Sequence, residues 1–152
     1  MLKSVAMAND RFELFVAAQN PIFPSVEAEL RGGRKQTHWM WFIFPQLVGL
    51  GLSEMSRRFG LASLEEAKAY LQHPILGLRL RDCTKWVLDM RDRDANQIFG
   101  SPDDLKFRSC MTLFSQAAPD DPLFRAALDH YFGGKSDPAT IGLLRRDSRR
   151  SD

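Results

Sequence analysis

The amino-acid sequence predicts an all-α protein, a single compact domain of about eight or nine short helices. Three observations support this fold class. Residues that start helices recur along the chain, glycine and proline separate the segments between them, and apolar residues within those segments recur at helical spacing. With 152 residues, of which 44% are hydrophobic and 26% charged, the chain has the size and composition of one globular domain.

Three helices are expected in the first third of the chain. Asp10 lies in capping-box spacing and opens a helix that Asn20-Pro21 ends. Ser25 caps a short second helix, which Gly32-Gly33 ends because glycine readily adopts the left-handed conformation at a helix terminus. The apolar stretch Thr37–Pro45 fits either a buried strand or a buried helix. We expect a helix, with its first residue as N-cap and its proline as the end, since no clear partner strand lies nearby.

The middle of the chain contains a loop followed by three helices. Gln46–Leu52 is glycine-rich and predicts the loop, after which Ser53 caps a short helix that ends at Gly60. Ser63–Glu66 is a capping box and opens a helix to about residue 72. His73-Pro74 breaks that helix, and the proline suits the first position of a new helix that runs to about residue 91.

The last third repeats the same start signals. Asp94 is expected to cap only a short turn, whereas Ser101–Asp104 combines a cap, a proline and two acids and predicts a helix to about residue 117. Asp121-Pro122 and Asp137-Pro138 start the final two helices. No repeat or linker divides the chain. We expect an N-terminal extension at residues 1–9, a helical domain at 10–144 and a basic flexible tail at 145–152.

Composition and charge exclude several classes of protein. No stretch approaches the roughly 18 apolar residues of a membrane span, and the N-terminus lacks the apolar core of a secretion signal. The net charge is +2, and residues 145–152, with four arginines and two aspartates, account for all of it. The body is therefore not a basic nucleic-acid-binding domain, and we expect nucleic acid or an acidic partner to contact only the tail.

Common catalytic motifs are absent from the sequence. It has no Gly-rich dinucleotide loop, no phosphate-binding P-loop, no HExxH zinc motif and no GxSxG nucleophile elbow. The histidines His38, His73 and His130 lie far apart, and Cys83 and Cys110 lack CxxC spacing. We therefore expect no metal and no cofactor, two buried free thiols, and a cytoplasmic location.

Gly32–Gln46 is the most unusual segment. It places cations, an imidazole and two indoles close together, at Arg34, Lys35, His38, Trp39 and Trp41. Such groups hold nucleotides, because a guanidinium pairs with phosphate, indoles stack on a base and an imidazole transfers protons. The same residues also suit a core plug. Core packing and a pocket wall both remain open, and they can hold at opposite ends of the segment.

A second candidate is the helix start Ser101–Thr112. Asp104, Arg108 and Thr112 share one helix face, and Lys106 lies on an adjoining strip. One interpretation is a capped helix with a surface pair between the aspartate and the arginine. The functional interpretation is a polar strip that lines a cleft for a phosphorylated ligand.

Three longer strings resemble one known family. They are ELRGGRKQTHWMWFIFPQLVGLGLS, SLEEAKAYLQHPILGLRL and IFGSPDDLKFRSCMTLFS, and the resemblance spans about Phe12–Leu144. On these strings the chain is identified as a member of the bacterial family of domains of unknown function numbered 1810, sometimes labelled calpastatin. True calpastatins are long, disordered and repetitive, and this compact, apolar chain does not fit that label. Membership implies no mechanism.

The chain also resembles, more distantly, the NADAR group, whose name refers to NAD and ADP-ribose. The shared features are an aromatic helix after a basic turn and a late helix–helix–glycine arrangement. Those domains are compact and mostly helical, and some are N-glycosidases that act on ribosylated heterocycles or remove ADP-ribose from a modified base. The acidic residue that they use in the aromatic helix has no counterpart at Thr37-His38-Trp39.

These features lead to the hypothesis of a small soluble protein that binds or hydrolyses an ADP-ribose-like or other phosphorylated nucleotide metabolite. If it is an enzyme, we expect N-glycosidic hydrolysis, with Asp104 stabilising charge on the sugar and His38 acting on the leaving base or water. The substrate-binding residues are then Arg34, Lys106 and Arg108 for phosphate, Trp39 and Trp41 for the base, and Thr112 beside them.

This hypothesis requires the segment Arg34–Trp41 to face the helix that begins at Ser101. The alternative is a non-catalytic protein-interaction module that uses the aromatic segment 38–46 as a partner groove. A purely structural, stress-related protein is a third possibility.

Overall fold

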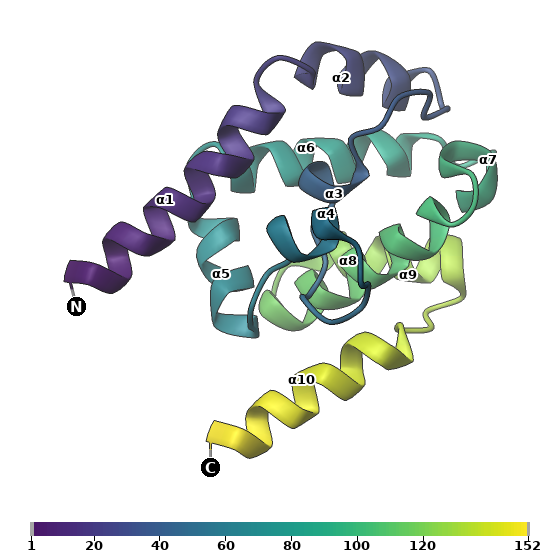
Figure 1. Ribbon diagram of the computed structural model, residues 1–152. Helices are drawn as coiled ribbons and strands as arrows, with labels where there is room; N and C mark the ends of the chain where they lie inside the picture. The colour runs from purple at the N-terminus through teal and green to yellow at the C-terminus, as the bar shows by residue number, and fades with distance from the viewer. Residues whose placement is uncertain (1, 152) are drawn as a thin grey trace.

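The computed structural model describes the backbone of residues 2–151 and the side chains of residues 11–147. Within this range the chain forms ten α-helices and no β-strand, so the all-α prediction is confirmed, with slightly more helices than expected (Figure 1). None of the described helices is long and apolar enough to cross a membrane. The helices are α1 (Leu2–Gln19), α2 (Phe23–Arg31), α3 (Met40–Ile43), α4 (Glu54–Arg58), α5 (Leu64–Gln72), α6 (Leu76–Asp89), α7 (Ala95–Phe99), α8 (Asp103–Ala117), α9 (Pro122–Phe132) and α10 (Pro138–Ser151).

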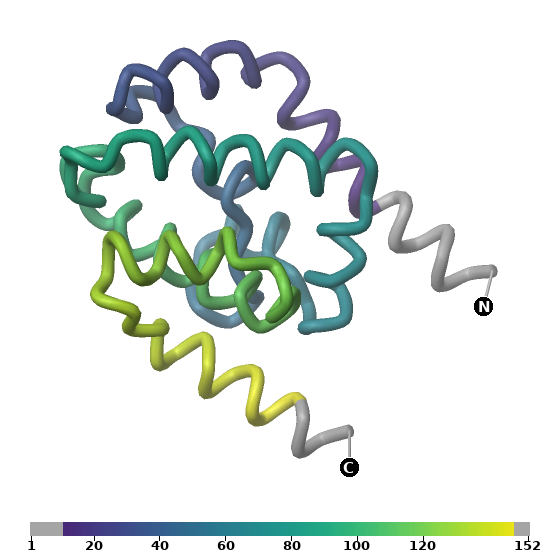
Figure 2. The backbone as a smooth tube through the Cα atoms, turned by 180° about the vertical axis from the view of Figure 1, so that it is seen from behind, coloured from purple at the N-terminus to yellow at the C-terminus, as the bar shows by residue number. Residues whose placement is uncertain are grey.

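The core is built around α8. This helix packs against α5, α7, α9 and α10, and its Phe107 and Phe114 are fully buried. α6 packs against α2, α5 and α9, and Figure 2 shows it crossing the molecule next to α9. Phe107 stacks on Phe99 with 4.7 Å between ring centroids and meets Phe44 in a T-shaped contact at 5.1 Å. The end of α3 is therefore joined to α7 and α8 through one aromatic cluster.

Helix starts that depend on one capping side chain follow the sequence prediction. The hydroxyl oxygens of Ser53 and Ser63 each accept a hydrogen bond from the backbone N–H three residues further on. Asp121 caps α9 in a similar way. Asp94 does more than start a turn, because it forms a complete capping box with Gln97 and opens α7.

Besides the start expected at Thr37, four predicted helix starts are wrong. α6 begins at Leu76 with Ile75 as its N-cap, so Pro74 lies in the turn before the helix and not at its first position. α1 begins at Leu2 rather than at Asp10, since the residues before Asp10 are mostly good helix formers and continue the helix upstream. α2 begins before Ser25, with Pro24 in its first turn, where a missing N–H costs nothing. The N-cap of α8 is Pro102 and not Ser101. The last helix, α10, continues to residue 151, so the backbone of the basic tail is helical as far as it is described.

The aromatic stretch Thr37–Pro45 forms a single helical turn rather than a full helix. Thr37 is not its N-cap, because the hydroxyl of Thr37 donates to a carboxylate oxygen of Glu29 at 2.7 Å. The N-cap position is occupied by Trp39, which makes no side-chain capping hydrogen bond. The segment is thus held by contacts to α2 and the core rather than by helical propensity.

A short backbone pairing folds the chain back after α3. The backbone N–H of Val48 donates to Leu61, and the N–H of Leu61 donates to Gln46, both at 2.8 Å. Gly60 lies beside this pairing, where a Cβ would come within 2.4 Å of the Ser56 carbonyl oxygen. In both views α2 and α10 lie at opposite edges of the molecule (Figures 1 and 2).

Candidate functional site

A pocket of about 250 Å³ lies where four separate segments meet. They are the end of the aromatic segment with its following loop, α4 with Gly60, the start of α8, and the start of α10. Most of its wall is apolar, from Leu47, Leu50, Phe59 and Leu105. We call it the Trp41 pocket, after the indole that forms one side.

The Trp41 pocket also contains polar groups. They are the amide of Gln46, the hydroxyls of Ser56 and Ser109, the ammonium of Lys106 and the carboxylate of Asp137. A largely apolar pocket with a few convergent polar groups is typical of a small-molecule site.

Lys106 and Trp41 meet in this pocket. The Nζ atom of Lys106 lies 3.6 Å from the centroid of the Trp41 ring, which is within the range of a cation–π contact. Both residues were predicted to bind substrate. The structure brings these two together from segments that are far apart in the sequence.

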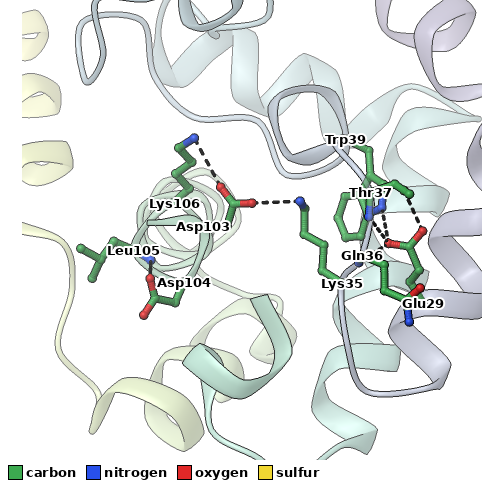
Figure 3. Close-up of polar contacts among 9 residues, drawn as sticks. All are labelled: Glu29, Lys35, Gln36, Thr37, Trp39, Asp103, Asp104, Leu105 and Lys106. Atoms are coloured by element: carbon green, nitrogen blue, oxygen red, sulfur yellow. Dashed lines mark hydrogen bonds and ion pairs between the residues drawn. The ribbon is translucent and has the colours of Figure 1, made fainter. Parts of the chain in front are cut away.

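An ion-pair chain extends from Lys106 toward the basic turn. Lys106 Nζ lies 3.3 Å from one carboxylate oxygen of Asp103, and Lys35 Nζ lies 2.9 Å from the other (Figure 3). Only 7% of the Lys35 side chain and 22% of the Lys106 side chain are exposed. Two ammonium groups share one carboxylate, so this group of three carries a net charge of +1 beside the pocket.

Glu29 holds the turn that carries Lys35. Its carboxylate accepts hydrogen bonds from the backbone N–H groups of Gln36 and Thr37, from the Thr37 hydroxyl and from the Trp39 indole N–H (Figure 3). Burial by itself would raise the pKa of Glu29, but these four hydrogen bonds outweigh it and lower the pKa below its ordinary value. Lys35 also lies 5.1 Å from the Trp39 ring centroid. The turn is therefore preorganised by α2.

Asp137 is held in place by α8 and α10. Its Oδ2 atom accepts hydrogen bonds from Ser109 and from the hydroxyl and backbone N–H of Thr140, and its own N–H donates to Thr112 at 2.9 Å. Arg108 donates to the backbone carbonyl oxygens of residues 135 and 136, just before this aspartate. Arg108 and the fully buried Thr112 thus position a pocket residue and do not line the pocket themselves.

The other predicted site residues lie elsewhere. His38 is exposed and Trp39 is 1% exposed, and neither lines the Trp41 pocket. Asp104 also lies outside the lining, where it accepts hydrogen bonds from the Asn96 side chain and the Leu105 N–H. Arg34 lines a different hollow, between the turn after α2 and α7. Of the eight predicted residues, Trp41 and Lys106 are the pair that share a pocket.

Several pocket residues carry no sequence motif that marks them as site residues. Asp137 was recognised only as a helix start, and its capping signal does not reveal that its carboxylate also borders a cavity. Asp103, which pairs with Lys106 but does not line the pocket, was recognised only as an acid near a helix terminus. Gln46 and Ser56 lie in segments read as a loop and a short helix, and no motif marks either of them. For Gln46, the one signal in the sequence is that it is a polar residue in the predicted glycine-rich loop.

The two cysteines are buried free thiols, as predicted. Burial raises the pKa of the Cys83 thiol and that of the Cys110 thiol well above their ordinary values. Among the described residues, no group of three or more His, Cys, Asp or Glu side chains is placed to hold a metal ion.

Comparison with known proteins agrees with the fold. The chain is similar to the conserved hypothetical protein Rv1873 from Mycobacterium tuberculosis, whose crystal structure matches with a TM-score of 0.86 and 53% identity. That match covers 88% of this chain and 95% of the other. A search of curated proteins found no match.

The family assignment follows from a match over nearly the whole helical domain. The descriptions of the solved structure and of the family do not mention the NADAR group, so that resemblance stays a prediction. The family model described as "Protein of unknown function (DUF1810)" matches residues 9–144, and the chain belongs to this family.

Proposed function

We propose that the protein binds a small phosphorylated ring compound, of the nucleotide type found in ADP-ribose-like metabolites, in the Trp41 pocket. The observation that carries the proposal is the position of the Lys106 ammonium, 3.6 Å from the Trp41 ring centroid within a largely apolar pocket. A single ligand in this pocket can therefore contact both the Trp41 ring and the Lys106 ammonium.

The ring of the ligand is assigned to the apolar part of the pocket. Trp41 is half-buried and presents an indole, while Leu47, Leu50 and Phe59 supply an apolar wall. Aromatic stacking adds about 0.5–1.5 kcal/mol to the free energy gained from burial. The amide of Gln46 and the hydroxyl of Ser56 can fix the orientation of the ring by hydrogen bonding.

The phosphate is assigned to Lys106. This ammonium is mostly shielded from water, and it shares Asp103 with Lys35, so the group of three retains a net positive charge. An anion that reaches this group neutralises that charge in a partly desolvated environment, where an ion pair is stronger than in water.

The volume of the pocket limits what it can enclose. Its roughly 250 Å³ lies just below the range of about 300–1,000 Å³ that is usual for pockets of drug-sized ligands. The pocket therefore suits one ring with part of its sugar, and the remainder of a larger metabolite would extend beyond it.

Hydrolysis of an N-glycosidic bond in this pocket would draw on Asp137 rather than on Asp104. Positive charge builds on the sugar as the bond breaks, and a nearby carboxylate stabilises it. Asp137 lines the pocket, and its orientation is set by Ser109 and Thr140. His38 lies outside the lining, so the proposal gives it no role in the chemistry.

The interaction-module alternative uses the same aromatic segment. Trp39, Ile43 and Phe44 are at most 2% exposed, which leaves Trp41 and Phe42 as its half-buried aromatic residues. The segment thus offers a partner protein less apolar surface than its sequence suggests. This observation favours the ligand-binding proposal over the module.

Calorimetric titration of the full chain with AMP, ribose 5-phosphate and ADP-ribose tests the proposal. We expect saturable binding of at least one compound and an affinity reduced about tenfold or more in Lys106→Met, the loss expected for a charge-assisted contact. Trp41→Leu should weaken AMP more than ribose 5-phosphate, because only AMP has a base to stack. Lys85→Met is the matched control, since Lys85 is exposed and outside the pocket.

The outcome that would overturn the proposal is equally clear. Absence of saturable binding by all three compounds would contradict the proposal. Equal affinities in Lys106→Met and Lys85→Met would show that the ligand does not bind at the Trp41 pocket. Turnover is checked separately by chromatography of the reaction products. If hydrolysis occurs, Asp137→Asn should abolish it while retaining a residue suited to capping α10, and Asp104→Asn should leave it nearly unchanged.

A further inference from the structure

A second hollow, of about 340 Å³, lies between the turn after α2 and the start of α7. We call it the basic hollow. The lining residues that matter for its chemistry are Arg34, Lys35, Arg93, Asn96, Gln97 and Gly100. The backbone N–H of Lys35 donates to the carbonyl oxygen of Ile98 at 2.7 Å, so the two sides of the hollow are joined by a direct hydrogen bond. This hydrogen bond fixes the position of the turn after α2 relative to α7, and thereby the shape of the hollow.

Three cations line the basic hollow, and one of them is neutralised by an ion pair. Lys35 is paired with Asp103, but neither Arg34 nor Arg93 takes part in the ion pairs formed among residues 11–147. Both arginines are exposed. The body of the protein has zero net charge without its tail, so this is a local accumulation of charge.

Gly33 allows the Arg93 side chain to lie against the turn after α2. It has a φ of +79°, and a Cβ at this position would lie 3.0 Å from Nε and 3.1 Å from Cδ of Arg93. Both the positive φ and the nearby Arg93 side chain disfavour a side chain at position 33. Because glycine has none, Arg93 can lie against Gly33. Arg34 and Arg93 both line the basic hollow, so an anion bound there lies near two positive charges.

Two aspartates accept hydrogen bonds from residues that line the hollow. Asp94 caps α7 by accepting from the N–H of Gln97 at 2.7 Å, and Asp104 accepts from the Asn96 side chain at 3.3 Å. The side-chain oxygen of Gln97 accepts from the backbone N–H of Asp94. The amide nitrogen of Gln97 is therefore left as a donor, and Gln97 lines the same hollow as the two arginines.

We infer that the basic hollow is a binding site for a small phosphoanion of the pyrophosphate type, with Arg34 and Arg93 as its main ligands. Guanidinium groups bind phosphoryl oxygens through paired hydrogen bonds, and two of them match the charge of a diphosphate. The concave shape and the neutral body favour a small anion over a nucleic-acid backbone. This inference does not depend on the Trp41 pocket, which has its own ligand and its own test.

Titration of the full chain with inorganic pyrophosphate tests the inference. We expect Arg93→Gln and Arg34→Gln each to weaken binding about tenfold or more, while Arg91→Gln, which removes the same charge at an exposed position outside the hollow, should change it less than twofold. Binding should also weaken with added salt, as expected for exposed charges. Far-UV circular dichroism of each variant verifies that it is folded.

Backbone amide spectra locate the anion. Pyrophosphate should shift the signals of Arg34, Lys35 and Gly100, and leave those of Gly51 and Gly60 at the Trp41 pocket unchanged. Equal affinities in Arg93→Gln and Arg91→Gln, or shifts confined to the pocket glycines, would overturn the inference. Tighter binding of a short single-stranded oligonucleotide than of pyrophosphate would also overturn it. If pyrophosphate binds as expected but none of the compounds tested against the Trp41 pocket does, the inference about the basic hollow holds and the proposed function is wrong.

Discussion

At the scale of single residues, Gly77 is constrained by its neighbours rather than by its backbone angles. A Cβ at this position would lie 2.0 Å from the carbonyl oxygen of Leu71, which is backbone and cannot swing away. Gly77→Ala should therefore lower the free energy of unfolding by about 1–3 kcal/mol through overpacking, as measured by denaturant unfolding. Gly142→Ala is the control. A Cβ there meets no atom within 4 Å, so the replacement should be neutral or stabilise α10 by up to about 1 kcal/mol.

Glu29 makes the stability of the site pH-dependent. Its pKa is lowered in the folded state, so its contribution is present above the unfolded pKa of about 4.3 and is lost as the pH falls through the folded value. Glu29→Gln should lower the free energy of unfolding by about 1–2 kcal/mol at pH 7, and the difference should shrink toward pH 3. Thermal unfolding at several pH values checks this. Glu27→Gln, which removes an exposed pair with Arg31, should cost less than about 1 kcal/mol, and an equal loss in the two variants would contradict the assignment.

At the scale of elements, the connection between α9 and α10 depends on α8. Arg108 donates two hydrogen bonds to consecutive backbone carbonyls of this connection, at 2.9 and 2.8 Å. Arg108→Lys should lower the unfolding free energy by about 1–3 kcal/mol, because an ammonium cannot reproduce the guanidinium fork. The thermal midpoint measures the loss. A stable Arg108→Lys variant that has lost AMP binding would instead indicate that Arg108 contacts ligand directly.

α10 should tolerate loss of its basic end. Among the described side chains of α10, Thr140 is fully buried, and Leu143 and Leu144 are partly buried and pack against the core. Arg145 and Arg146 are exposed. Truncation after Leu144 should keep the thermal midpoint within about 2–4 °C, the shift that 1 kcal/mol causes in a domain of this size. A larger decrease would show that the end of α10 stabilises the fold.

At the scale of the whole molecule, one aromatic and aliphatic core connects nearly all elements. Residues of every helix from α1 to α9 except α4 join a single buried cluster, and residues of α4 and α10 pack against it. We therefore expect unfolding in one cooperative transition, with far-UV and near-UV circular dichroism giving the same midpoint. The far-UV spectrum should be helical. A spectrum dominated by strand, or two separated transitions, would contradict a single all-α domain.

The helical fold could be largely predicted from local signals. A cap such as Ser63 or Asp121 bonds to an N–H two or three residues away, so it acts without any contact from a distant segment. The capping signal at Asp10 failed because propensity upstream extended the helix, and the one at Thr37 failed because Glu29 took the hydroxyl. Local rules therefore hold where no stronger partner competes for the same group.

The sequence by itself determined the helical class, several of the helix starts, the neutral body and the family. Tertiary structure alone decided which of two neighbouring tryptophans is buried: Trp39 in the core beside Glu29, and Trp41 at the pocket with Lys106. It also decided that Asp137, rather than Asp104, borders that pocket. The physical reason is that these contacts join segments distant in the chain, and their pairing depends on how the complete core packs, which no local spacing encodes.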